Sequence, residues 1–322
     1  MVLVWGSRSL SLPLRPWCRG LSGLCCPLAP RRSLLRLRGP HTPAFLQGLM
    51  TNDAARLKEG ALYAHLLSVQ GRSLYDVILY RLSTGNDDPS DVLLECDISA
   101  VEPIQSHLKV YNFRKKVDIQ PCPELSVWAV ISSQTNLEPP NKKLPAPAVL
   151  CTPDPRVAVM GWRLVAQTEA NVKDILPNCQ MGCFHDYCKH RYEQGIPEGV
   201  HDIPPGVALP LESNVVYLNG ISFSKGCYVG QELTARTHHT GVIRKRLVPV
   251  RLSSPLTPGT QGLEIITASG KAAGKYRAGL GDLGLALLRL AHVNEELHIK
   301  VDNQGLINVK ASIPEWWPKP TE

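Results

Sequence analysis

The order of helical and extended segments is the feature that most restricts which folds this chain of 322 residues can adopt. Thr42 and Pro43 suit the cap and first position of a helix, and two apolar strands then meet at Gln70-Gly71, where glycine permits a tight hairpin. A strand over 91–97, a helix after Pro103 and further strands continue the pattern. Helices grouped with strands in this way favour α+β layers over a doubly wound parallel sheet.

The pattern of apolar residues and glycines changes at Leu247. From there to the end, short apolar segments alternate with glycines, which predicts a small antiparallel β-barrel over 247–322. Before it, a proline-rich stretch over 138–155 interrupts the strand pattern and is expected to form a long surface loop. The predicted body therefore consists of an α+β region, 41–246, and a barrel.

The first 40 residues carry seven arginines and no acidic residue, and they are rich in serine and leucine. This composition is typical of a mitochondrial presequence, and it predicts that residues 1–40 are removed in the matrix together with Cys18, Cys25 and Cys26. Without these arginines, 28 basic residues face 28 acidic ones, so we expect no nucleic-acid partner, although a basic arm is the alternative. No apolar run reaches about 18 residues, so no membrane span is expected.

The seven later cysteines are odd in number and irregularly spaced, which in a reducing compartment indicates free thiols or metal chemistry. Five possible ligands crowd into "CQMGCFHDYCKH", namely Cys179, Cys183, His185, Cys188 and His190. Their spacing matches no usual zinc or iron–sulfur pattern, so we favour a helix that merely carries thiols and imidazoles.

The stretch "SKGCYVGQELTAR" is the stronger candidate. Cys227 lies among Gly226, Tyr228 and Gly230, and glycines allow unusual dihedral angles. Lys225 would favour the thiolate, the form of cysteine that attacks electrophiles and binds metals, and Gln231, Glu232 and Arg236 add polar groups. Structural and functional roles for the thiol both stay open on chemistry alone. A lone cysteine cannot enclose a cluster, so it would supply one ligand to a shared site.

"KGCYVGQELTAR" with "GVIRKRL" resembles the signature of the YgfZ family, whose members are GcvT-like proteins with the fold of the glycine-cleavage aminomethyltransferase. Other stretches resemble that family in the same order: "FLQGLMTND", "QGRSLYDVIL", "LKVYNFRKKVDI", "RYEQGIPEG", "ALPLESN" and "GLALLRL". The resemblance implies an α+β fold with two α+β subdomains within 41–246 and a carboxy-terminal antiparallel barrel, arranged around a folate-sized cavity.

Together with the presequence, the resemblance implies a mitochondrial matrix factor that helps to mature 4Fe–4S client enzymes, late in assembly and with A-type ISCA scaffolds. Cys227 would then be one shared iron–sulfur ligand, for example to a 2Fe–2S cluster held with a partner. Lys225 and Arg236 would support its charge, and the glycines would hold the loop open.

The same resemblance implies two alternatives. In a tetrahydrofolate-dependent one-carbon transferase, Asp76 would be catalytic and Glu212 a second pterin-facing residue. Only Asp76 remains of the acidic pair usual in the aminomethyltransferases, because Tyr75 replaces its neighbour. This loss favours a non-catalytic assembly factor on a transferase fold. The second alternative is an inactive scaffold with this fold that only bridges partners.

Overall fold

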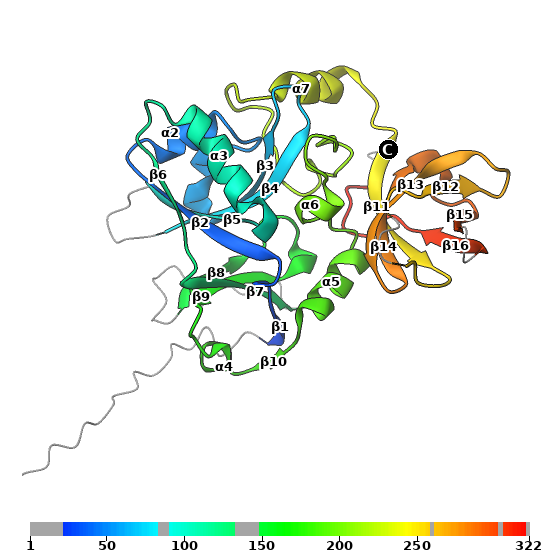
Figure 1. Ribbon diagram of the computed structural model, residues 1–322, viewed down its shortest axis with the longest axis horizontal. Helices are drawn as coiled ribbons and strands as arrows, with labels where there is room; N and C mark the ends of the chain where they lie inside the picture. The colour runs from blue at the N-terminus through cyan, green and yellow to red at the C-terminus, as the bar shows by residue number, and fades with distance from the viewer. Residues whose placement is uncertain (1–21, 83–89, 133–147, 258–260, 302–304, 320–322) are drawn as a thin grey trace, which may run out of the picture.

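A computed structural model describes residues 22–82, 90–132, 148–257, 261–301 and 305–319. Two five-stranded sheets and a closed six-stranded barrel make up its β-structure. The sheets and their helices lie on one side of the molecule and the barrel on the other (Figure 1). This arrangement confirms the α+β class and the separate carboxy-terminal barrel.

The first sheet is antiparallel throughout and has the order β3-β4-β5-β2-β6. Its strands are β3 (Ala61–Leu67), β4 (Ser73–Arg81), β5 (Asp91–Asp97), β2 (Arg32–Arg38) and β6 (Asp118–Pro121). Helices α2 (Thr42–Gln47) and α3 (Val101–Tyr111) cover one face, where Phe45, Leu46, Ile104 and Leu108 join an apolar core. The predicted hairpin at Gln70-Gly71 is confirmed, because β3 and β4 pair on either side of it.

The second sheet has the order β10-β1-β7-β9-β8, and only the β1–β10 pair is parallel. Its strands are β10 (Cys179–Met181), β1 (Gly23–Pro27), β7 (Leu125–Ile131), β9 (Trp162–Gln167) and β8 (Ala148–Pro153). A shared core of Tyr63, Ile78, Leu93, Val127 and Val165 joins the two sheets. Short helix α4 (Val172–Ile175) packs on a further core of this sheet.

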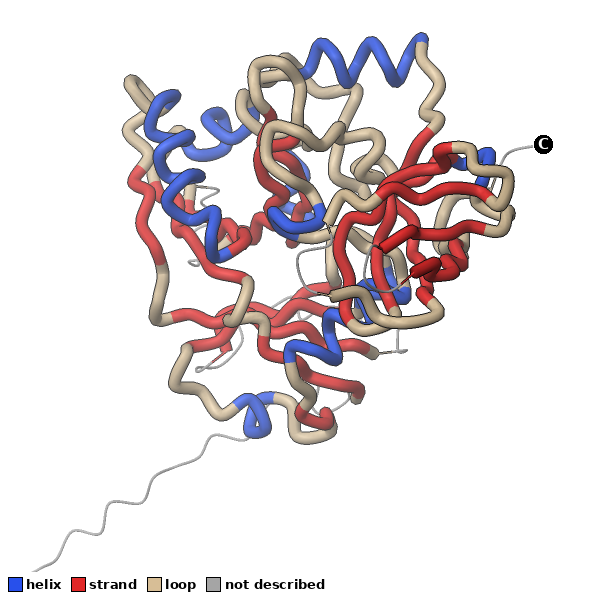
Figure 2. The backbone as a smooth tube through the Cα atoms, turned by 45° about the vertical axis from the view of Figure 1, so that its right-hand side comes forward, coloured by secondary structure: helices blue, strands red, loops and turns tan. Residues whose placement is uncertain are grey.

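The barrel closes in the order β11-β14-β13-β12-β15-β16. Its strands are β11 (Lys245–Leu252), β14 (Leu283–Arg289), β13 (Ala272–Leu280), β12 (Glu264–Thr267), β15 (Leu297–Val301) and β16 (Gly305–Ala311). Helix α5 (Phe184–Glu193) packs against it through Cys188 and Tyr192, and helix α6 (Gly199–Asp202) lies nearby. Helix α7 (Gln231–Thr240) leads into β11 along the edge of the molecule (Figures 1 and 2). Short 3-10 turns cover Ala54–Glu59, Ile98–Ala100, Ala158–Met160 and Leu290–His292.

The predicted boundary at residue 40 is wrong. Strands β1 and β2 lie inside the two sheets, with Leu34, Leu35 and Leu37 buried, so the folded body begins by Gly23 at the latest. Cys25 and Cys26, expected to leave with the presequence, are also fully buried. Only three of the seven arginines precede residue 22, so 32 basic residues face 28 acidic ones in 22–322.

Three local predictions also need correction. His41 occupies the cap of α2, while the Thr42 hydroxyl donates to the Gly39 carbonyl at 2.8 Å. Helix α3 begins at Val101, because Pro103 is tolerated in a first turn. Residues 148–153 of the predicted loop form strand β8, and residues 138–147 lie outside the described ranges. Within the described ranges, no helix is both long and apolar enough to cross a membrane.

Candidate functional site

Cys227 lies on a surface loop, 222–230, and the Lys225 side chain anchors this loop to the body of the protein. The Lys225 ammonium donates to three backbone carbonyls at the end of α2 and just beyond it, those of Gln47 and Met50 at 2.7 Å and that of Asn52 at 2.9 Å. It also lies 4.8 Å from the centre of the Tyr228 ring, within the range of a cation–π contact. Burial lowers the pKa of Lys225 to about 8. This geometry gives Lys225 an anchoring role, since its donors point to carbonyls.

Two backbone hydrogen bonds hold the loop on either side of the cysteine. The Ser222 amide donates to the Thr51 carbonyl at 3.1 Å, and the Val229 amide donates to the Gly48 carbonyl at 3.0 Å. Because both acceptors belong to the segment after α2, the loop is fixed to one rigid support. Cys227 lies between these two hydrogen bonds, is exposed to solvent and forms no disulfide.

The two glycines of the loop have different structural roles. Gly230 has φ +78°, and a Cβ there would lie 2.2 Å from the Ser68 carbonyl oxygen. It packs against Gly71 at the tip of the β3–β4 hairpin, where a Cβ would in turn meet the Gly230 carbonyl at 3.0 Å. Gly226 has open space around it and an ordinary φ. Only Gly230 is therefore required by the backbone and by close packing.

The remaining residues of the motif lie at the start of α7. The Gln231 side chain accepts a hydrogen bond from the Tyr228 amide at 3.2 Å, and the Tyr228 side chain is buried, which raises its pKa to about 12. Glu232 and Arg236 are exposed on the helix. The structure thus joins Lys225, Tyr228, Gly230 and Gln231 into the support of the loop. The predicted electrostatic roles of Lys225 and Arg236 toward the thiol stay predictions.

Asp76 lies in an enclosed network of charges between the two sheets. Its Oδ1 accepts a hydrogen bond from the Gly199 amide at 2.9 Å, and its Oδ2 lies 3.6 Å from Arg32 Nη1. Burial raises the pKa of Asp76, and the Arg32 charge opposes this effect. Only 3% of the residue is exposed, so the carboxylate has no open face toward a ligand.

Two further ion pairs and a hydrogen bond, all at Glu198, complete this network. Glu198 accepts from Arg156 at 2.7 Å, from Arg163 at 2.9 Å and from the Tyr187 hydroxyl at 2.6 Å. The charges of Arg32, Arg156 and Arg163 hold the pKa of Glu198 well below its usual range, against the opposing effect of burial. Breaking a buried pair of this kind at one partner is strongly destabilising, because it leaves the other charge buried without compensation.

Glu212, the second predicted folate contact, is partly buried in a different electrostatic environment. Burial raises its pKa, and the charges of Lys245, Arg72 and Arg277 oppose that shift. None of these three residues is among the charges that most affect the pKa of Asp76. The structure therefore gives no sign that the two carboxylates act on one ligand, and their folate roles stay predictions.

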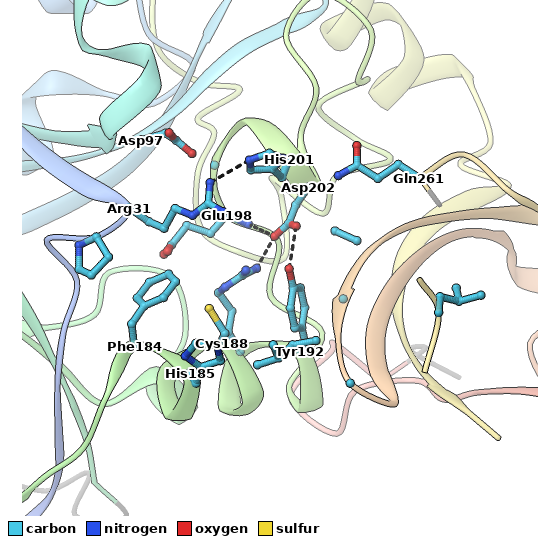
Figure 3. Close-up of a pocket in the computed structure, with 18 of the residues that line it drawn as sticks. Arg31, Asp97, Phe184, His185, Cys188, Tyr192, Glu198, His201, Asp202 and Gln261 are labelled. Carbon is cyan, nitrogen blue, oxygen red and sulfur yellow. Dashed lines mark hydrogen bonds and ion pairs between the residues drawn. The ribbon is translucent and has the colours of Figure 1, made fainter. Parts of the chain in front are cut away.

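A cavity of about 600 Å³ lies between α5, α6, the start of β2 and strand β13 of the barrel (Figure 3). Arg31 and His201 bond across its mouth at 2.9 Å, and Asp202 is paired with Arg191 and accepts from the Tyr192 hydroxyl at 3.4 Å. Arg32 also lines the cavity, and its Nη1 and Nη2 have no hydrogen-bond partner within the described ranges. Asp76 and Glu212 are not among the lining residues.

This cavity fits a small anion better than it fits the predicted folate chemistry. The cations Arg31 and Arg32, which line it, suit a carboxylate or phosphate group. The arrangement does not fit a pterin held by Asp76, because Gly199 and Arg32 already enclose that carboxylate. Sequence reasoning missed Arg31 and Arg32, since both were assigned to a presequence and no local signal marked them as part of a site.

The cysteine-rich stretch does not form a metal centre in the described part of the chain. No group of three or more His, Cys, Asp or Glu side chains there is placed to hold a metal ion. Cys179 and Cys188 are buried, and Cys183 is exposed at the start of α5. Of the nine cysteines in the described ranges, Cys183 and Cys227 are exposed and the other seven are buried.

Comparison with known proteins identifies the family. The chain is 50% identical over 303 residues to the mouse "Iron-sulfur cluster assembly factor IBA57, mitochondrial", covering 89% of this chain and 84% of that protein. The human protein of the same name is also 50% identical, over 301 residues, with 89% and 83% covered. The chain belongs to the IBA57 family. A fungal homologue in this family, from Mycosarcoma maydis, is 32% identical over 345 residues, with 90% and 84% covered.

The other comparisons agree with the fold of this IBA57 family member. A family profile described as "CAF17, C-terminal beta-barrel domain" matches residues 244–319, which contain the observed barrel. The glycine cleavage system aminomethyltransferase T from Bartonella henselae superposes with a TM-score of 0.70 at 15% identity, covering 92% of this chain and 87% of that one. The GcvT-like fold is therefore confirmed. The resemblance stated from the cysteine motif is confirmed by the IBA57 relatives, and the chain is mitochondrial, as they are.

Proposed function

We propose that this chain is a mitochondrial assembly factor for iron–sulfur proteins, and that Cys227 is its point of contact with a cluster. The names of its relatives at 50% identity support the general role. The observation that carries the specific role is the exposed Cys227 thiol on a loop that Lys225 fastens with three hydrogen bonds. A thiol with a purely structural role is ordinarily buried, whereas Cys227 is held at the surface.

The geometry suits a thiolate that completes a site held mainly by a partner. A thiolate is the ligating form of cysteine, and a cluster normally takes four protein ligands. One loop cysteine supplies a single ligand, so an A-type ISCA scaffold would supply the others and the 2Fe–2S cluster would be cargo between two proteins. A pre-positioned loop loses little conformational entropy on docking, which favours such a shared complex. The 4Fe–4S client enzymes would receive the product.

Anaerobic mixing of the protein with a cluster-loaded A-type scaffold tests this role. The wild type should form a complex on size exclusion that retains the visible absorption of the cluster, and Cys227→Ser should lose the complex or change its spectrum. Cys183→Ser is the matched control, because Cys183 is the other exposed thiol in the described ranges. An identical complex and spectrum for Cys227→Ser and the wild type would refute the ligand role.

A cellular measurement separates the thiol's role from the protein's role. Cells that carry only Cys227→Ser should lose aconitase-type activity, while Cys183→Ser should restore it. Normal activity with Cys227→Ser, in cells that lose activity without the protein, would leave an assembly factor that works without this thiol. That result would favour the scaffold that only bridges partners.

A second candidate function is binding of reduced folate, favoured by the cations Arg31 and Arg32 that line the cavity of Figure 3. The carboxylate groups of a folate would match these donors, and the enclosed Asp76 predicts binding without turnover. Isothermal titration with tetrahydrofolate should show micromolar affinity that Arg31→Gln weakens, since Arg31 lines the cavity mouth. Absence of binding at millimolar folate would eliminate this candidate, and turnover would restore the transferase.

A further inference from the structure

A rigid turn over 112–117 joins α3 to β6 on the side of the molecule away from the barrel (Figure 1). The Asn112 side chain closes it, because its Nδ2 donates to the Val117 carbonyl at 2.6 Å and its Oδ1 accepts from the Val117 amide at 3.1 Å. Gly39 lies against the turn so closely that a Cβ there would be 2.7 Å from the Lys116 carbonyl oxygen. Lys116 itself has φ +50°, a conformation that lysine rarely adopts. The turn is therefore a built feature with a fixed shape.

This turn displays apolar side chains to solvent. Phe113 is 89% exposed, and Val110 on the last turn of α3 is 73% exposed. Tyr111, which makes an edge contact with His107, is 36% exposed. Single exposed apolar residues are ordinary, but three within four positions on a rigid support form a patch.

Cations surround the patch. Lys109, Arg114, Lys115 and Lys116 are all exposed, and the Arg114 guanidinium lies 6.0 Å from the centre of the Phe113 ring. The nearest carboxylate along the chain is that of Asp118, which accepts a hydrogen bond from Gln120 at 3.0 Å. The surface formed by residues 109–116 thus combines a projecting aromatic with four positive charges.

We propose that the 109–116 surface binds an anionic lipid bilayer. Phe113 and Val110 would enter the boundary between headgroups and acyl chains, and the four cations would face lipid phosphates. Aromatic and apolar residues set among lysines and arginines are the composition by which proteins attach to the surface of anionic membranes. The contact would be peripheral and reversible.

Two observations favour a lipid surface over an acidic protein. Three of the four cations are lysines, and lysine is depleted at protein–protein interfaces. The apolar part is a small projecting wedge of three side chains, whereas a stable protein interface needs about 800 Å² on each partner around an apolar centre. A wedge of this size can be covered by headgroups and acyl chains without a matching socket.

Vesicle co-sedimentation of the full chain tests the proposal. We expect binding to vesicles of equal parts phosphatidylcholine and phosphatidylserine, weak binding to phosphatidylcholine alone, and loss of binding at high salt. Phe113→Ser should weaken binding about tenfold, from the loss of an inserted ring. Arg114→Gln with Lys115→Gln should weaken it roughly thirtyfold, from about 1 kcal/mol for each cation near the surface.

Matched controls separate this surface from other basic or apolar residues of the chain. Leu306→Ser removes a side chain that is 58% exposed on the barrel, and Lys300→Gln removes an exposed charge there; both should bind as the wild type does. Binding to anionic vesicles that Phe113→Ser does not change would overturn the proposal. So would Phe113-dependent binding to polyglutamate without binding to vesicles, because it would indicate an acidic protein partner.

Discussion

Replacing Lys225 by methionine should release the cysteine loop while leaving the rest of the fold intact. The change keeps a side chain of similar length but removes three donors to backbone carbonyls at 2.7, 2.7 and 2.9 Å. A hydrogen bond from a charged donor contributes about 1.5–3 kcal/mol net. Burial of the ammonium, which lowers its pKa to about 8, offsets part of the sum. We therefore expect the loop to lose about 3 kcal/mol of local stability.

Native-state hydrogen exchange measures this loss directly. The Ser222 and Val229 amides bond to the segment after α2, so a loss of about 3 kcal/mol should speed their exchange roughly a hundredfold. Lys58→Met, at an exposed lysine of the same subdomain, should leave both rates unchanged. Unchanged protection at Val229 in Lys225→Met would refute the anchoring role, and the loop would then be held by other contacts.

Two further predictions concern a glycine and a buried carboxylate. Gly230→Ala should lower the free energy of unfolding by about 2–4 kcal/mol, because it places a side chain at φ +78° and a Cβ 2.2 Å from a carbonyl oxygen. Gly226→Ala is the control and should be nearly neutral, since the space around Gly226 is open. Urea unfolding midpoints measure the difference, and equal midpoints for the two variants would contradict the prediction. Glu198→Gln should lower the free energy of unfolding by about 3 kcal/mol at neutral pH, since it removes one of the buried charges that Arg156 and Arg163 share with Asp154. The pKa of Glu198 is lowered from its ordinary value of 4.5, so its contribution is present above that pH and lost as the pH falls toward the folded-state value. Stability should therefore fall less steeply below pH 4.5 in Glu198→Gln than in the wild type, and equal slopes would contradict this account.

Much of the fold could be predicted because its signals are local. Glycine at position 71 marks a hairpin whose partners are a few residues apart, and the glycine-broken strands after Leu247 mark the barrel. The first two strands could not be recognised in this way. Arg32 and Arg36 look like presequence arginines until the fold pairs them with Glu95 and Asp91, 63 and 55 positions away. Composition cannot distinguish an arginine that a distant carboxylate will neutralise from one that stays exposed.

At the candidate site, too, the features that could be predicted are local in the sequence and those that could not depend on distant residues. The cysteine, its glycines and the polar residues that follow are contiguous, so the motif could be found by reading along the chain. The role of Lys225 could not be found, because its three acceptors lie 173 to 178 positions away. Sequence reasoning therefore paired this lysine with its nearest chemical neighbour, the thiol, whereas the fold directs it to carbonyls.

Strands β1 and β2 should be part of the minimal chain that folds. A chain that begins at residue 41 lacks β2, which pairs with both β5 and β6 inside the first sheet, and lacks β1, which pairs with both β7 and β10. It also leaves Glu95, a fully buried carboxylate, without the Arg32 donor at 2.7 Å. Breaking a buried pair at one partner costs about 3–5 kcal/mol, and loss of the buried Leu34, Leu35 and Leu37 side chains costs about 2–5 kcal/mol each, so the sum is comparable to or larger than the 5–15 kcal/mol by which domains are ordinarily stable. The chain from residue 41 should therefore be insoluble or lack a cooperative urea transition, while the chain from residue 22 should unfold cooperatively. Equal urea midpoints for the two chains would mean that β1 and β2 are dispensable, and that the folded body does begin where the composition of the sequence changes.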